Sequence, residues 1–157
     1  MKYFCILIFY LCISGSFAKK LIIDEILKFE VLSESTFSDK SKYQTFLTEG
    51  GATFSNGLYA KKKCTGDRTI KEGKLIQLKS ICEFVTSSKQ KFWVKVGGED
   101  RYLSTGIGYF TIIDGTGTFK DIIGKKCTYA LSFFDNLIFS KGSCDLDIKI
   151  YDRLIEQ

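Results

Sequence analysis

A tetrapeptide, Lys-Lys-Cys-Thr, occurs twice in this chain, and each copy supplies the first cysteine of a pair. The first pair is Cys64 and Cys82, which lie 18 positions apart, and the second is Cys127 and Cys144, which lie 17 positions apart. Each interval has a turn signal near its middle and residues typical of strands on both sides. Each pair therefore predicts two facing positions on one β-hairpin.

The second hairpin can be aligned on itself with Asp135-Asn136 as a two-residue turn, so that paired positions have numbers that sum to 271. The pairs on one face are then Cys127 with Cys144, Tyr129 with Gly142, Leu131 with Ser140, and Phe133 with Ile138. This face is mostly apolar, as we expect of a strand face that points into a core.

The first hairpin, around Glu72-Gly73-Lys74, is aligned by pairing positions whose numbers sum to 146. The predicted pairs are Cys64 with Cys82 and Ile70 with Ile76 on one face, and Lys63 with Glu83 and Asp67 with Lys79 on the other. Opposite charges meet across the strands, which supports the register. Lys62 and Arg68 fall on the cysteine face, where apolar residues are expected.

Residues 1–18 are typical of a secretory signal, with Lys2 as the positive segment, an apolar stretch at 4–13 and Ser16-Phe17-Ala18 as the cleavage site. The apolar stretch is shorter than the ~20 residues that span a bilayer. We therefore expect export, to the periplasm or out of the cell, a mature chain that begins at Lys19, and no transmembrane segment once the signal is removed. Residues 19–157 have the size of one domain.

The charge of the mature segment does not favour nucleic-acid binding. It has 22 Lys and Arg against 18 Asp and Glu, and the lysines are scattered along the chain. The densest run, 61–63, lies in a predicted strand beside Cys64, where a solvated strand face explains it. We expect no nucleic-acid partner.

Export also decides how the cysteines are interpreted. An oxidising compartment favours disulfides, and the chain contains no histidine and no Cys-x-x-Cys spacing, so no zinc or other metal site is predicted. Four mature cysteines allow three connectivities. The hairpin alignments favour Cys64 with Cys82 and Cys127 with Cys144 over the other two.

The chain has no proline, and its apolar runs are rich in β-branched and aromatic residues and end at Gly, Asn or Asp. This pattern predicts an all-β domain. The expected strands are 21–31, 43–47, 57–64, 74–86, 91–96, 106–113, 127–134 and 137–148. The segment 21–32 also fits a helical pattern, and both alternatives remain open there.

The segment 106–124 consists of a strand, a glycine turn at Gly115 and Gly117, and a second stretch with Phe119 and Gly124, which is expected to be extended. It resembles the Gly-Thr-Gly-x-Phe-x-x-x-x-Gly stretch of the barrel superfamily that includes allene oxide cyclases and dirigent proteins. The resemblance implies a single closed antiparallel β-barrel of about eight strands, with Phe119 at the barrel end. None of the active residues of those families has a counterpart here.

The absence of histidine excludes a Ser-His-Asp triad, a Cys-His pair and an imidazole metal site. Carboxylates remain available for acid-base chemistry, and the candidates are Asp24, Glu25, Glu83, Asp114, Asp121, Asp145 and Asp147. Asp145 and Asp147 would share one strand face, where a solvated edge explains them better than calcium binding or catalysis. No catalytic residue is assigned, and no cofactor is expected.

Aromatic residues supply the candidates for ligand binding. Trp93 and Tyr109 each have an aromatic neighbour in sequence, so one member of each pair points into the barrel and the other could line a cavity or lie outside. Tyr129 and Phe133 lie on the apolar face of the second hairpin. These four residues are the predicted ligand contacts.

The sequence thus predicts an exported, disulfide-bonded β-barrel that binds a small apolar ligand or a protein partner without catalysis. The alternatives are a cofactor-free cyclase or isomerase that acts on a reactive lipid in the barrel, and an interaction module with a filled interior. A continuous apolar cavity would favour the first two, and a buried, unpaired carboxylate in that cavity would favour the enzyme.

Export can be tested on protein purified from an oxidising compartment. We expect intact mass spectrometry to show a chain that begins at Lys19, and its four cysteines to react with an alkylating reagent only after reduction. Free thiols in the non-reduced protein would overturn the argument from compartment.

Overall fold

The computed structural model describes residues 18–98, 101–102 and 105–155. The predicted signal therefore lies outside the described residues, except for Ala18, which begins the first strand. The elements, in chain order, are β1 (Ala18–Thr36), β2 (Lys42–Phe54), β3 (Tyr59–Lys71), β4 (Lys74–Thr86), β5 (Lys91–Gly98), β6 (Arg101–Tyr102), β7 (Thr105–Gly115), the 3-10 helix η1 (Gly117–Ile122), β8 (Lys126–Phe134), β9 (Leu137–Asp147) and α1 (Ile148–Ile155).

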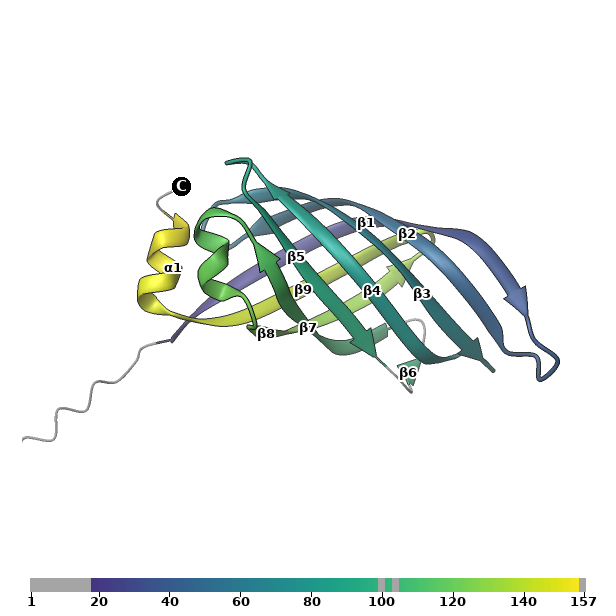
Figure 1. Cartoon of the computed structure of the whole chain (residues 1–157). Helices are drawn as coiled ribbons and strands as arrows, with labels where there is room; N and C mark the ends of the chain where they lie inside the picture. The colour runs from purple at the N-terminus through teal and green to yellow at the C-terminus, as the bar shows by residue number, and fades with distance from the viewer. Residues whose placement is uncertain (1–17, 99–100, 103–104, 156–157) are drawn as a thin grey trace, which may run out of the picture.

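Eight of these strands form a closed barrel in which every strand is antiparallel to both of its neighbours (Figure 1). Consecutive strands pair from β1 to β5, and then β5 with β7, β7 with β8 and β8 with β9, while β9 returns to β1. The two-residue β6 pairs only with the start of β4. The prediction of a single antiparallel barrel of about eight strands is confirmed.

Alternation of side chains along the strands defines an inside and an outside. In β4, Ser80, Cys82 and Phe84 are buried, while the intervening Ile81 is exposed. The same period of two recurs around the barrel because successive residues of a strand point to opposite faces. The segment 21–32, which had two interpretations, is entirely strand within β1.

Both disulfides are those that the hairpin alignments favoured. Cys64 pairs with Cys82 between β3 and β4, and Cys127 pairs with Cys144 between β8 and β9. Their Cα atoms are 3.9 and 4.6 Å apart, and all four residues are buried inside the barrel. Two strands separate the bridged hairpins in either direction around the barrel, so the bridges lie on opposite walls.

The register of the second hairpin is as predicted, with Tyr129 opposite Gly142 and Phe133 opposite Ile138. The first hairpin is as predicted near its disulfide, but its pairing shifts by one residue close to the turn. Glu72 and Gly73, with φ of 51° and 75°, make a two-residue turn of the kind that matches strand twist. The extra residue is absorbed by a bulge, so Ile70 lies opposite Leu75 and not Ile76.

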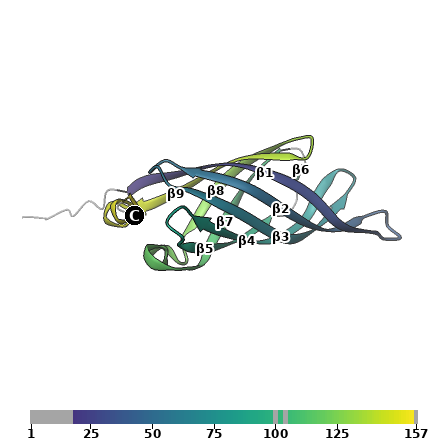
Figure 2. The same ribbon diagram turned by 90° about the horizontal axis from the view of Figure 1, so that it is seen from above.

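The strand ends also differ from the expectation. β2 and β3 run much further than 43–47 and 57–64, because the glycines and charged residues that seemed to end them are accommodated in a long, paired ribbon. β1 pairs with β9 only as far as Lys28, while its pairing with β2 continues to Thr36. The β1–β2 hairpin therefore extends beyond the barrel (Figures 1 and 2).

One end of the barrel is plugged by η1 and α1, which lie together at that end in Figure 1. The sequence predicted an extended stretch around Phe119, which is wrong, because the chain forms the 3-10 helix η1 there after Gly117 takes a φ of 55°. Helix α1 was not predicted at all. Its first turn is capped by Asp147, whose Oδ1 accepts a hydrogen bond from the Lys149 amide at 2.9 Å.

A column of aromatic rings fills the plugged half. Phe119 stacks on Phe92 with ring centroids 4.6 Å apart, and Phe92 stacks on Phe84 at 4.3 Å. Phe54 meets the last two rings edge-on. Leu146 and Leu154 are fully buried beside this column, so the plugged end is a packed core.

The aromatic column makes Phe119 a strong test of the plug. Phe119→Ala should lower the free energy of unfolding by about 3–5 kcal/mol, because it leaves a cavity where the side chain is 1% exposed. Urea unfolding measures the loss. Phe134→Ala is the matched control, since Phe134 is 67% exposed and should change stability by less than about 0.5 kcal/mol. Equal losses in the two variants would contradict the assigned packing.

Candidate functional site

The other half of the barrel contains a cavity of about 110 Å³. One water needs only roughly 10–15 Å³ of such space, so the cavity can hold a small molecule. Its wall is mainly apolar, and it is lined by Leu27, Phe29, Phe46, Leu75, Leu78, Phe84, Val94, Val96, Phe110, Tyr129, Leu131, Phe133 and Ile138, among others. Phe29, Leu131 and Phe133 are only half-buried, so solvent reaches this end.

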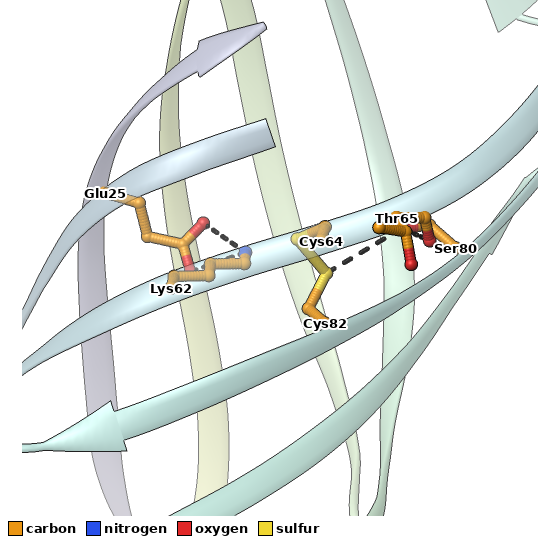
Figure 3. Close-up of a disulfide and its surroundings, with 6 residues drawn as sticks. All are labelled: Glu25, Lys62, Cys64, Thr65, Ser80 and Cys82. Atoms are coloured by element: carbon orange, nitrogen blue, oxygen red, sulfur yellow. Dashed lines mark hydrogen bonds and ion pairs between the residues drawn. A yellow bond between two sulfur atoms is a disulfide. The ribbon is translucent and has the colours of Figure 1, made fainter. Parts of the chain in front are cut away.

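A buried ion pair forms the floor of the cavity. Lys62 Nζ donates to both carboxylate oxygens of Glu25 at 2.8 Å, and the two side chains are only 10% and 7% exposed (Figure 3). Lys62 Nζ also lies 4.9 Å from the ring centroid of Phe84, the last ring of the aromatic column. The ion pair therefore separates the packed half of the barrel from the cavity.

Small residues on β2 allow this pair to form. Lys62 is on β3 and Glu25 on β1, with β2 between them. Gly50 lies opposite Lys62, and Ala52 lies opposite Glu25, so no large side chain of β2 stands between the two charges. A Cβ on Gly50 would come within 2.1 Å of the Ile26 carbonyl oxygen, so only glycine fits where β1 and β2 approach.

One disulfide belongs to the cavity wall. Cys64 and Cys82 both line the cavity, and neighbouring Ser80 donates a hydrogen bond from its hydroxyl to the Thr65 carbonyl at 3.2 Å (Figure 3). The bridge holds β3 and β4 together between the ion pair and the hairpin end. It therefore ties β3, the strand that carries both Lys62 and Arg68, to β4.

A second charged group, the Arg68 guanidinium, lies further along β3, nearer the turn between β3 and β4. The Arg68 guanidinium lines the cavity, lies 4.4 Å from the ring centroid of Phe29, and donates from Nε to Gln44 Oε1 at 2.7 Å. Gln44 donates in turn to Glu34, which also accepts from Lys42 Nζ at 2.8 Å. We call Arg68, Gln44 and Phe29 the mouth of the cavity.

Burial and hydrogen bonds shift the pKa values of two groups here. Burial lowers the pKa of the Arg68 guanidinium, and the charge of Glu34 opposes that shift. Hydrogen bonds from Lys42 and Gln44 hold the pKa of the Glu34 carboxyl below its usual value. Arg68 stays cationic at neutral pH because an arginine side chain does not lose its proton in proteins.

Two of the four predicted ligand contacts line the cavity. Tyr129 and Phe133 point inward from β8, as the alignment of the second hairpin predicted. Trp93 and Tyr109 do not line it, because strand alternation places the neighbouring Phe92 and Phe110 inside. Outside the barrel, Trp93 Nε1 donates to Glu83 Oε2 at 3.1 Å, and Lys126 Nζ lies 4.2 Å from the Tyr109 ring centroid.

Sequence reasoning missed the roles of the three charged residues in the cavity. Glu25 was only one of several carboxylates, and Lys62 and Arg68 were noted as exceptions on the cysteine face. The position of Lys62 and Arg68 on an otherwise apolar inward face was the signal that could have revealed their roles, because a charged residue there must find a partner or solvent inside the barrel. Its partner on β1 could not be identified without the closed sheet.

The described part of the chain contains no cluster of carboxylates and cysteines able to hold a metal ion. Asp145 is exposed, and Asp147 caps α1. A scan against protein-family models finds no match, and a search of curated proteins finds no similar sequence.

The buried pair should respond to substitution very differently from an exposed pair. Lys62→Met should lower the free energy of unfolding by about 3–5 kcal/mol at neutral pH, because it leaves the Glu25 carboxylate buried without a partner. Adding Glu25→Leu to Lys62→Met should restore most of the loss, since replacing both charges removes the unpaired one. Urea unfolding of the single and double variants measures both effects.

Lys141 supplies the matched control. Its Nζ lies 3.2 Å from Asp24 Oδ1 on the outer face of β9 and β1, and both side chains are more than half exposed. Lys141→Met should cost less than about 1 kcal/mol. A similar loss for Lys62→Met and Lys141→Met would show that the Lys62 pair is not buried in solution.

Proposed function

We propose that this protein is an exported, non-catalytic β-barrel that binds a small, mainly apolar molecule inside its barrel. The observation that carries the proposal is the cavity between the ion pair and the mouth, whose wall is mainly apolar, with phenylalanine and leucine the commonest residues. Ligand sites in proteins are typically concave, mostly apolar, and supplied with a few placed polar groups. The cavity has this composition.

The state of Glu25 favours binding over catalysis. A general acid or base works best as a carboxyl group that is free to exchange a proton with the ligand. Both oxygens of Glu25 instead accept hydrogen bonds from Lys62, so the carboxylate is held as one half of an ion pair. The resemblance to the allene oxide cyclase barrels is retained as a proposal about fold ancestry, without their reaction.

Export is part of the same proposal. Two disulfides are compatible with an oxidising compartment. Among the described residues, no helix is both long and apolar enough to cross a membrane. The signal-like segment at 1–18 remains the sequence argument for export.

Ligand binding can be tested by blocking the cavity from one strand. We expect the neutral fluorophore N-phenyl-1-naphthylamine to gain fluorescence on binding the native protein, and Leu131→Trp to weaken that binding at least tenfold by filling the cavity. Ser132→Trp is the matched control, because the neighbouring side chain points outward and is exposed.

Urea unfolding of both variants checks that each is folded, since an added large side chain can cost about 1–3 kcal/mol in a packed interior. Absence of probe binding to the native protein, or equal weakening by the two tryptophan variants, would count against a ligand site inside the barrel.

A further inference from the structure

The charges on the described residues that line the cavity do not balance. Among the described residues that line it, Glu25, Lys62 and Arg68 are charged. Glu25 and Lys62 neutralise each other across two hydrogen bonds. Arg68 therefore leaves one positive charge against an apolar wall, where solvent screens charges less than at an open surface.

The guanidinium of Arg68 is also incompletely bonded. It has five N–H groups, of which Nε–H donates to Gln44. Among the described residues, none accepts a hydrogen bond from its four Nη N–H groups. The nearest acidic side chain of the network, Glu34, is occupied by Gln44 and Lys42 and acts on Arg68 only through its charge.

Two neighbours hold this guanidinium in a fixed place. Phe29 stacks against it at 4.4 Å, and Gln44 fixes the Nε side. Phe29 in turn contacts Phe46 and Phe133, with ring centroids 5.4 and 5.7 Å away. A planar donor group is thus positioned at the edge of an aromatic wall, so one ligand could contact both.

We propose that the ligand is a small monocarboxylic acid with an apolar body, and that Arg68 binds its carboxylate at the mouth. The planar guanidinium matches a carboxylate with two parallel hydrogen bonds, and such charge-assisted bonds are the stronger ones in proteins. The apolar body would extend along Phe29, Phe46 and Phe133 toward the ion pair. This inference rests on the proposed function, since it requires a ligand inside the barrel.

The test compares two ligands that differ only in their head group. Octanoate and 1-octanol are titrated at pH 7.4 against native protein carrying N-phenyl-1-naphthylamine, and displacement of the probe gives each affinity. We expect octanoate to bind at least tenfold more tightly than 1-octanol, the range that hydrogen bonds to a charged group supply.

Three variants assign that preference to Arg68. Arg68→Gln should remove the preference for octanoate and leave the affinity for 1-octanol within about twofold, which also shows that the variant is folded. Arg68→Lys should retain part of the preference, because it keeps the charge but loses the planar fork. Lys61→Gln, at an exposed cation on the outer face of the same strand, should change neither affinity.

The outcomes separate the two proposals. If octanoate and 1-octanol bind native protein equally, or if Arg68→Gln keeps the preference, the carboxylate site is wrong and the apolar ligand site stands. If neither the probe nor either ligand binds, the proposed function itself is wrong. If Lys61→Gln removes the preference for octanoate as fully as Arg68→Gln does, the preference comes from the overall charge of the protein, and the carboxylate site at Arg68 is wrong.

Discussion

Pairing of β1 with β9 is the constraint on which the rest of this structure depends. It closes a sheet that would otherwise end in two unpaired edges, and it gives every strand an inner and an outer face. Leu21, Ile23 and Leu27 are buried only because β9 and β2 flank β1 on both sides. The disulfides add covalent links on opposite walls of a barrel whose closure depends on backbone hydrogen bonds.

The interior has two parts with different physical character. Stacked phenylalanines, η1 and α1 fill one half, while the other half keeps a cavity with an apolar wall. The ion pair of Lys62 and Glu25 lies at the boundary, where each charge supplies the hydrogen bonds that the other loses on leaving water. A barrel of eight strands is just wide enough for either outcome, and side-chain size decides between them.

Local sequence signals failed where the tertiary structure competed with them. The turn at Glu72-Gly73 was recognised, but the bulge beside it was not, because a bulge depends on how two strands fit over their whole length. The stretch around Phe119, after the glycine turn, was expected to be extended, and η1 forms there because Phe119 and Ile122 can both enter the barrel end. Helix α1 is short, and its burial against η1 and β1 supplies stability that its sequence alone lacks.

The sequence by itself determined the all-β class, both disulfides and the inward face of the second hairpin, because these follow from alternation and turn chemistry within neighbouring strands. It also placed Tyr129 and Phe133 inside. Only the tertiary structure decided that Trp93 and Tyr109 lie outside and that Lys62 has Glu25 as its partner. The physical reason is that Lys62 and Glu25 are on strands that do not pair, and their contact exists only after the sheet has curved into a closed barrel around a gap at Gly50.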